Sequence, residues 1–537
     1  MKWISYILIT GLLIFQVSCT KDFAELNTDP NRATPESFNA DFFLTNAQNT
    51  YKETIGGYNG PVLFQTGWVQ LMSSTSTGGA VYYSNMDKYV QSSNTLSYTS
   101  GSWNNAFRSA SLANEIIKIY GDDAARANSV AAATVIKVMA LAYATDIYGD
   151  IPYSEAFKGA EGLNTPKYDK QEVVLKGLLA ELEKASGMFS STDPNKLPLS
   201  VDLVYNKDVT KWKKLANSVM LRIAMRFTKR DAAFAKAWAE KAYAGGVFTS
   251  IADDAFMKSD IANGYTNPNN RAYDIPADLY EVRWSKTLID FLKATNDPRV
   301  SAIAEIVTGF AANNSLAAGD NTYAKQLGMP NGWDMNGGAT DITKAPGYPG
   351  PSGTGSDVTP IGNYSRPRGH YRDRNGALFF MTYAETELLL AEAAVRGWSV
   401  GANAATHYAN GVKAGMATMA NMGTSAVIAA ADIDAYVAAN PLNTSSTNAS
   451  LKMINEQFWA TAGTLMNGSE AWSNWRRSGY PVLAPVVYAG NFSGGQIPRR
   501  QLYPTSEGSL NGDNYNAGVS GLTPASDSWS SRVWWDQ

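Results

Sequence analysis

Three carboxylates and two tyrosines gather in one short segment of the sequence, TDIYGDIPYSEA, at residues 145–156. Asp146, Asp150 and Glu155 are spaced closely enough to act as an acid/base pair or to hold a hard cation such as calcium. Asp and Gly also collect at turns for backbone reasons alone, and this segment contains both Gly and Pro. The sequence therefore favours a structural role, in which the carboxylates fix a turn and the tyrosines pack against the next helix. It leaves a bound calcium ion open.

Other patterns of catalysis or metal binding are weak. The chain has two histidines, His370 and His407, far apart in the sequence, and a single cysteine, so it lacks the clustered ligands of a zinc site. No G-x-S-x-G elbow surrounds a serine, and the Gly-rich run at 353–357 lacks the features of a phosphate loop. A glycoside hydrolase needs only two carboxylates, but no particular pair stands out. We therefore predict no catalytic residues, no metal and no other cofactor.

Aromatic residues in Gly-, Asn- and Ser-rich stretches are the better candidates for a site. Aromatics make up 11% of the chain, whereas charged residues make up only 17%. Rings on rigid loops can stack on sugars or on apolar peptide side chains, while neighbouring polar groups form hydrogen bonds. Two clusters qualify, one within residues 68–103 and one within 265–334. The predicted ligand-binding residues are Trp68, Tyr82, Tyr83, Tyr89, Tyr265, Tyr323, Trp333 and Asp334.

Helices must position these loops. Apolar residues recur at helical spacing in residues 109–147, where Gly121 separates two helices. Long irregular stretches at about 55–105 and 247–376 interrupt the helical pattern. The sequence predicts a mainly α fold with a helical frame at about 109–245 and 378–480, two long insertions and a C-terminal coil at 481–537. Further helices are expected at about 41–54, 170–188, 209–228, 231–244, 380–396, 453–466 and 470–477.

The N-terminus has the pattern of a bacterial lipoprotein. Residues 1–18 carry one early charge and then an apolar run that is too short to span a bilayer, as in a signal peptide. Small residues precede Cys19, the only cysteine, although Gln16 departs from the Leu usual in the cleavage box. We expect Cys19 to carry lipid, residues 19–40 to form a tether and residues 41–537 to form a single domain. The net charge of -3 gives no basic footprint for nucleic acid.

Several motifs, taken in order, resemble the SusD/RagB family of nutrient-binding outer-membrane lipoproteins, in particular its SusD-like branch. They are NTDPN at 27–31, TDIYGDIPYSEA at 145–156, INEQFWATAGTLMNGSEAWSNWRRSGYPVL at 454–483 and IPRRQLYPTSEGSLNGDNYNAG at 497–518. The resemblance implies a tetratricopeptide-like stack of helical pairs, which the periodicity of the sequence does not itself show. It also implies that Arg476, Arg499 and Arg500 hold the C-terminal part of the fold together.

The resemblance implies a function in nutrient capture. Such a protein would be anchored to the outer membrane of a member of the Bacteroidota, facing the exterior. It would bind a glycan or a peptide and deliver it to a SusC-like TonB-dependent β-barrel transporter. In the family these motifs belong to the scaffold, so no ligand-binding residue follows from them. Two alternatives stay open: a surface glycoside hydrolase or esterase, and a structural partner of the transporter with no ligand of its own.

Overall fold

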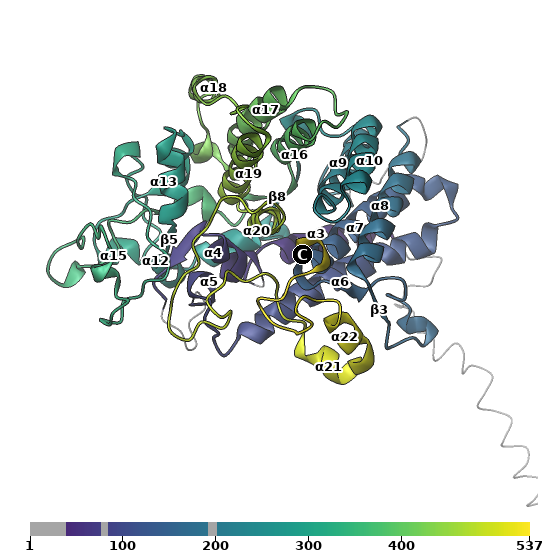
Figure 1. Cartoon of the computed structure of the whole chain (residues 1–537), viewed down its shortest axis with the longest axis horizontal. Coiled ribbons are helices and arrows are strands. Elements are labelled where there is room, and N and C mark those ends of the chain that lie inside the picture. Colours follow the sequence, from purple (N-terminus) through teal and green to yellow (C-terminus); the bar gives the residue numbers. More distant parts are fainter. Residues whose placement is uncertain (1–38, 59, 77–83, 192–200) are drawn as a thin grey trace, which may run out of the picture. The chain divides into compact units, whose positions relative to one another are not determined.

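Helices that pack on their neighbours in sequence form most of the fold. The computed structural model describes residues 39–58, 60–76, 84–191 and 201–537, and the chain from Asp41 onward forms one unit. In its first part each helix contacts the one before it, on the right of Figure 1. These helices are α3 (Phe42–Ile55), α6 (Thr95–Tyr120), α7 (Ala127–Tyr148), α8 (Gln171–Met188), α9 (Val209–Arg226) and α10 (Ala232–Gly245).

A second block of helices, most of which lie in the upper part of Figure 1, contacts the first block through α16 and α9. The predicted mainly α frame is confirmed, with three differences in the bounds. The first block begins at Thr95 instead of residue 109. The helix α16 begins at Tyr383 instead of residue 380, because residues 377–381 form a strand, and α19 begins at Thr447 instead of residue 453. The helices of this block are α16 (Tyr383–Val395), α17 (Ala404–Ala417), α18 (Ala430–Ala439), α19 (Thr447–Thr464) and α20 (Gly468–Ser478).

The helix α7 runs through the interior. Its Ala-rich sequence is apolar on every face, and the segment Ala124–Tyr148 is long and apolar enough to cross a membrane by composition. However, 89% of its most apolar window is buried inside the fold, as expected of a core helix. Gly149 ends α7 with a φ of 99°, a conformation that favours glycine. This glycine therefore marks the end of the helix.

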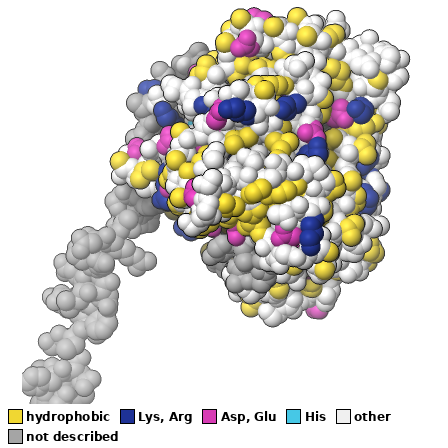
Figure 2. All heavy atoms as spheres, turned by 90° about the vertical axis from the view of Figure 1, so that its left-hand side faces the viewer, with side chains coloured by type: hydrophobic (Ala, Val, Ile, Leu, Met, Phe, Trp, Pro, Cys, Tyr) yellow, Lys and Arg dark blue, Asp and Glu magenta, His cyan; other side chains and the backbone are white. Residues whose placement is uncertain are grey.

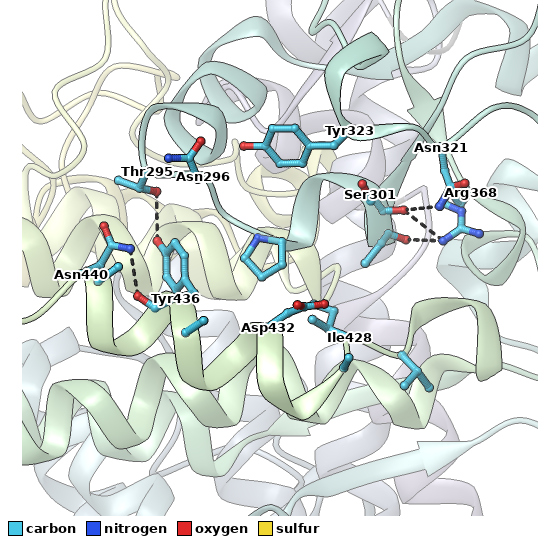
Figure 3. Close-up of a pocket in the computed structure, with 16 residues that line it drawn as sticks. Thr295, Asn296, Ser301, Asn321, Tyr323, Arg368, Ile428, Asp432, Tyr436 and Asn440 are labelled. Atoms are coloured by element: carbon cyan, nitrogen blue, oxygen red, sulfur yellow. Dashed lines mark hydrogen bonds between the residues drawn. The ribbon is translucent and has the colours of Figure 1, made fainter.

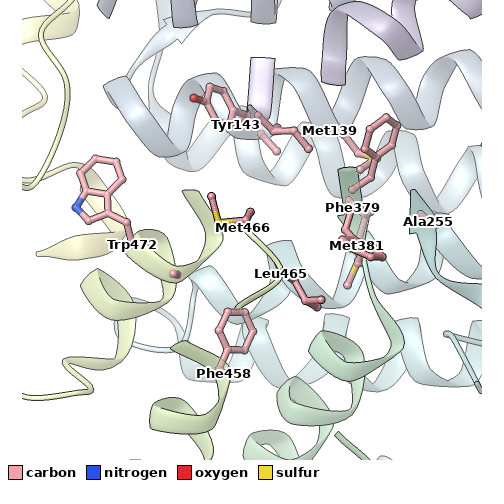
Figure 4. Close-up of a cluster of buried hydrophobic side chains, with 14 of the residues drawn as sticks. Met139, Tyr143, Ala255, Phe379, Met381, Phe458, Leu465, Met466 and Trp472 are labelled. Atoms are coloured by element: carbon pink, nitrogen blue, oxygen red, sulfur yellow. The ribbon is translucent and has the colours of Figure 1, made fainter. Parts of the chain in front are cut away.

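The main core extends through the fold, and part of it lies where the two helical blocks meet. Figure 4 shows Met139 and Tyr143 of α7 near Phe379 of the short strand β8 (Ala377–Met381), with Phe458 of α19 and Trp472 of α20 on the other side. All five side chains are buried. Close packing of this kind fixes the frame from which the loops extend.

The two predicted loop regions contain short elements and are tied together. Within the described residues the sheets have two antiparallel strands each, and β1 pairs with β5 so that Met72 lies opposite Trp284. This pairing joins the region 55–105 to the region 247–376. The other short elements include β2 (Ile151–Pro152), β3 (Tyr168–Asp169), β4 (Ala255–Lys258), β6 (Ala304–Glu305), β7 (Arg366–Pro367), α4 (Thr66–Trp68), α5 (Ser84–Lys88), α11 (Pro268–Tyr273), α12 (Pro276–Glu281), α13 (Lys286–Ala294), α14 (Arg299–Ile303) and α15 (Phe310–Asn313), with β1 at Met72–Ser74 and β5 at Val282–Trp284.

The C-terminal segment is more ordered than the predicted coil. It forms two short helices, α21 (Thr505–Leu510) and α22 (Gly512–Val519), so the prediction of coil over 481–537 is wrong there. Arg476 holds this segment to the frame, because its Nη1 donates to the backbone oxygens of Asp146, at 2.8 Å, and Arg499, at 2.9 Å. Its guanidinium also stacks 3.6 Å from the centroid of the Trp472 ring.

Arg499 and Arg500 also hold the C-terminal segment in place. Arg499 pairs with the buried carboxylate of Asp536, and Arg500 donates from Nη2 to the backbone oxygen of Tyr148 at 3.1 Å. The predicted role of these arginines as scaffold residues is confirmed.

Candidate functional site

The carboxylates of the segment 145–156 do not converge. Asp146 accepts a hydrogen bond from Nε of Arg226 at 3.0 Å, and Asp150 accepts one from the backbone N–H of Gln171 at 2.8 Å, at the start of α8. Glu155 accepts a backbone N–H across the turn at 2.8 Å. Burial raises the pKa of Asp146, against the opposing effect of the Arg226 charge. Each carboxylate thus has its own structural partner, and the structural interpretation is confirmed.

The histidines are structural as well. His407 lies 2.8 Å through Nδ1 from Oε2 of Glu387 and 3.0 Å through Nε2 from a backbone oxygen, so both ring nitrogens are occupied. His370 lies 3.1 Å through Nδ1 from Oγ of Ser425, and burial lowers its pKa to about 3. Over the part of the chain that the structure describes, no three His, Cys, Asp or Glu side chains gather as metal ligands.

The first predicted aromatic cluster belongs largely to the core. Trp68 and Tyr89 have no exposed surface, and the Trp68 ring packs 5.1 Å from that of Trp472, centroid to centroid. Neither ring presents a face to a ligand, so both are removed from the candidate residues. The reason is that the apolar run around Trp68 turns inward between α20 and the C-terminal segment. Tyr82 and Tyr83 lie outside the described residues.

The second predicted cluster is divided among three places. Tyr265 packs beside Lys52 of α3, whose Nζ lies 5.9 Å from the ring centroid. Tyr323 lines a cavity beside α18. Trp333, which is half-buried, packs on a small separate core. That core consists of Met329, Ile342, Ala345, Ile361 and Tyr364. Sequence proximity thus does not bring these rings together, and Trp333 and Tyr323 mark two different surfaces.

Trp333 stands on a loop that is fastened to the N-terminal end of α13. The backbone N–H of Lys286 donates to the oxygen of Met329 at 2.8 Å, and the N–H of Met329 donates to the oxygen of Trp284 at 2.9 Å. The loop is therefore fixed to β5 and α13 immediately before Trp333. These elements are in turn paired with β1.

Asp87 of α5 holds the next part of this loop. Its side chain is fully buried, and Oδ2 accepts from the backbone N–H of Gly332 at 3.0 Å, from Nδ2 of Asn331 at 3.2 Å and from Oγ of Ser73 at 3.1 Å. Its other oxygen, Oδ1, pairs with Nζ of Lys88 at 3.1 Å. Sequence reasoning missed Asp87, because nothing in a polar five-residue helix indicates which distant loop it will reach.

Gly332 is required at the turn that presents Trp333. Its φ is 86°, in the left-handed region that favours glycine. A Cβ at this position would lie 2.6 Å from Cγ1 of Val486, closer than side-chain atoms approach one another. The segment around Val486 therefore packs directly against the Trp333 loop.

Asp334 supports the loop and is not placed to contact a ligand. It is 2% exposed, and its carboxylate accepts from Oη of Tyr488 at 2.7 Å, from Oγ1 of Thr340 at 2.6 Å and from the backbone N–H of Asn336 at 2.9 Å. Burial acts to raise its pKa, but these hydrogen bonds outweigh burial, and the pKa is lowered. The prediction that Asp334 binds a ligand is corrected accordingly, and Tyr488 is a residue that the sequence did not point to.

Residues 332–336 and 486–488 together form what we call the Trp333 surface. This surface includes the half-buried ring of Trp333, the half-buried phenol of Tyr488 and the side chain of Val487, which is 88% exposed. The side of the molecule that carries α12, α13 and α15 shows apolar and neutral polar side chains with scattered charges (Figure 2). Rigid aromatic groups in neutral polar surroundings can stack on a ligand and accept or donate hydrogen bonds, without a group poised for catalysis.

Comparison with known proteins identifies the family. A family model described as "starch-binding associating with outer membrane", SusD-like, matches residues 30–504. A solved chitin-binding protein is 31% identical, with a TM-score of 0.75, over 93% of this chain and 100% of that chain. A SusD-like protein of the Bacteroidetes is 25% identical, with a TM-score of 0.73, over 93% of this chain and 100% of that one.

A chitin-binding SusD homologue from Flavobacterium johnsoniae shares the fold at 23% identity, with a TM-score of 0.68, over 92% of this chain and 98% of that chain. No curated protein sequence matches the chain significantly. The helical frame follows the tetratricopeptide-like fold of these neighbours, and members of the family are binding proteins rather than enzymes. Because the family match spans most of the chain and the structural similarity extends over nearly all of each relative, the protein belongs to the SusD-like family.

Proposed function

We propose that this protein binds a glycan at the Trp333 surface and delivers it to a SusC-like TonB-dependent transporter in the outer membrane. The observation that carries the proposal is the placement of Trp333. Its ring is half-buried on a small core and is held by a loop that buried hydrogen bonds fix at Gly332 and Asp334. A ring that is already fixed loses little conformational entropy when a sugar stacks on it.

The relatives support a carbohydrate ligand. The family model is described as starch-binding, and the relative that is 31% identical is described as chitin-binding. Starch and chitin are both neutral polymers, and the Trp333 surface presents no free carboxylate at its centre, because the Asp334 carboxylate is buried and hydrogen-bonded within the protein. A peptide ligand is the alternative within the same function.

The location follows from the same proposal. Cys19, which lies outside the described residues, would carry the lipid that anchors the protein to the outer membrane, facing the exterior, with residues 19–40 as a tether. We expect Cys19→Ser to move the protein from the membrane fraction to the soluble fraction without changing its affinity for a glycan. A variant that stays in the membrane fraction would show that another feature anchors the chain.

The test of binding is calorimetric titration of protein that begins at Thr20 with maltoheptaose and with chitohexaose. Trp333→Leu keeps the contact with the small core but removes the aromatic face, so we expect affinity to fall about tenfold with little change in melting temperature. The matched control is Trp238→Leu on α10, another half-buried tryptophan on a different part of the frame. Its affinity should equal that of the wild type.

The same samples distinguish the alternatives. Chromatography of each mixture shows whether the oligosaccharide is recovered intact, and cleaved ligand would favour a hydrolase over a binding protein. Equal affinities of the two tryptophan variants would remove the Trp333 surface as the site. If neither glycan nor peptide bound and the protein still co-purified with a β-barrel, the structural-partner alternative would replace the proposal.

A further inference from the structure

A cavity of about 650 Å³ lies between α18 and the loops at the C-terminal end of α13 (Figure 3). Its volume falls within the range of about 300–1,000 Å³ that is typical of small-molecule sites. Figure 3 shows Tyr323 on one side and Asp432 and Ile428 on the other, with Arg368 at one end. Its walls come from four separate stretches of the chain, at 295–302, 321–323, Arg368 and 427–440.

The walls are fixed before any ligand binds. Oγ1 of Thr295 lies 3.0 Å from Oη of Tyr436, which joins the end of α13 to α18, and Nδ2 of Asn440 donates to the backbone oxygen of Tyr436 at 2.9 Å. On the opposite side, Nζ of Lys293 donates to the backbone oxygen of Gln326 at 2.9 Å and so holds the loop that carries Tyr323. The cavity is therefore preformed.

Several polar groups at the cavity lack a partner within the protein. Oη of Tyr323 is buried and accepts or donates no hydrogen bond among the described residues. Nη1 of Arg368 donates to the backbone oxygens of Ser301, at 3.1 Å, and Ser425, at 2.7 Å, whereas its Nε and Nη2 reach no other described residue. The exposed carboxylate of Asp432 forms no ion pair in the same part of the chain. An unsatisfied buried hydroxyl is unfavourable, so a ligand that bonds to it gains affinity.

The chemistry of the lining indicates the class of ligand. One guanidinium and one carboxylate balance each other, and the remaining polar side chains, such as Asn296 and Asn321, are neutral and can both donate and accept. Pro298 and Ala302 add apolar surface. This combination suits hydroxyl groups and the apolar faces of sugar rings. We propose that the cavity is a second glycan-binding site, which takes a short segment of a neutral oligosaccharide.

The position of the cavity relates it to the Trp333 surface. The Trp333 loop is fastened to Lys286 at the start of α13, and the cavity begins at Thr295, just past its end. A helix of nine residues is about 14 Å long, so the point at which the Trp333 loop is fastened lies roughly that distance along the helix from the start of the cavity. The inference rests on the proposed function, because one glycan chain would supply both sites. Simultaneous binding would raise the affinity for long oligosaccharides above that for short ones.

Two variants test the cavity without disturbing the fold. Tyr323→Phe removes only the unpartnered hydroxyl, and Asp432→Asn neutralises a carboxylate that has no ion-pair partner among the described residues. The matched controls make the same chemical changes elsewhere. Tyr273→Phe removes a buried unpartnered hydroxyl in α11. Asp434→Asn neutralises a second carboxylate of α18, the helix that carries Asp432, and Asp434 pairs with Lys413 at 2.6 Å.

The measurement is calorimetric titration with chitobiose and chitohexaose, and with maltose and maltoheptaose, in the wild-type and the Trp333→Leu backgrounds. We expect each cavity variant to weaken the binding of the preferred sugar about five- to tenfold, in both backgrounds, while the controls bind like their parent proteins. We also expect the advantage of the longer sugar over the shorter one to disappear in the double variants.

Each other outcome overturns one part of the argument. Cavity variants that bind every sugar like the wild type would refute the second site, even if Trp333→Leu weakens binding and the proposed function stands. Loss of binding in the cavity variants alone, with Trp333→Leu unchanged, would place glycan binding in the cavity only. If the cavity bound a zwitterionic peptide, with salt-sensitive affinity, in place of sugars, the assignment to carbohydrate would be wrong. No binding of any sugar to the wild type would refute both proposals.

Discussion

The substitution Asp87→Asn would test whether the buried ion pair of α5 holds the Trp333 surface in place. Asp87 and Lys88 are both fully buried, and their charged atoms lie 3.1 Å apart. The amide has nearly the same shape and can still accept from Gly332, but it cannot neutralise the ammonium group of Lys88. The variant therefore isolates the charge from the packing.

The expected loss of stability follows from this burial. Removing one partner of a buried ion pair leaves the other charge uncompensated in a low dielectric, which lowers the free energy of unfolding by about 3–5 kcal/mol. Replacing both partners leaves no buried charge. We therefore expect the double variant Asp87→Asn with Lys88→Met to recover most of the loss.

Urea unfolding of both variants and the wild type, followed by tryptophan fluorescence, gives these free energies. Glycan affinity is then measured by calorimetry at a temperature at which all three proteins are folded. Because Gly332 and Asn331 depend on the same carboxylate, we expect Asp87→Asn to weaken glycan binding as well. The exposed pair Lys413–Asp434 provides a control, and Asp434→Asn should change stability by less than about 1 kcal/mol.

A free energy of unfolding for Asp87→Asn within about 1 kcal/mol of the wild-type value would contradict this prediction, because an uncompensated buried ammonium group should destabilise the fold by more than that. A double variant as unstable as the single one would contradict the role of the unpaired charge. That result would assign the loss to the hydrogen bonds of Asp87 and not to the unpaired charge of Lys88.

Three further predictions concern stability. Burial raises the pKa of Asp254 to about 7, so the folded state holds the proton of this carboxyl more tightly than the unfolded chain does. The stability of the protein should therefore fall as the pH rises from about 4 to 7. In urea unfolding, Asp254→Asn should remove this pH dependence and stabilise the protein at pH 8 by about 4 kcal/mol. Glu392 behaves oppositely. Despite its burial, Arg477 lowers its pKa to about 2, which stabilises the fold fully above about pH 4.5. In urea unfolding, Glu392→Gln should lose about 3 kcal/mol at pH 7 and less than about 1 kcal/mol at pH 2. Gly332→Ala should destabilise the protein by at least about 1 kcal/mol and weaken glycan binding, as measured by unfolding and titration, whereas unchanged values would contradict the close contact with Val486.

The helices were largely predictable from the sequence because their determinants are local. Apolar residues at helical spacing, with Gly121 between two helices, predicted the frame, and the bounds of α3, α8, α9 and α10 differ from expectation by about one or two residues. The beginning of α6 was missed, because its first turns are rich in Ser, Thr and Gly and carry little periodicity. The family motifs were also readable, because they are runs of consecutive residues.

The candidate site was predictable only in part. Trp333 was identified because a tryptophan in a Gly- and Asn-rich loop has few apolar neighbours in the sequence. The same reasoning chose Trp68, which is fully buried, because sequence does not show that Trp472 packs against it from more than 400 residues away. Whether a ring is exposed depends on the partners that the fold brings to it.

By itself, the sequence determined the helical frame, the lipoprotein-like N-terminus and the family, all of which depend on residues close together along the chain. Only the tertiary structure decided which aromatic rings reach the surface, that Asp87 and Tyr488 fix the Trp333 loop, and that Tyr323, Arg368 and Asp432 meet at one cavity. The physical reason is that these contacts are long-range. Each contact depends on packing between segments that lie far apart in the sequence, and many of these segments are loops without a regular period that could predict the contact.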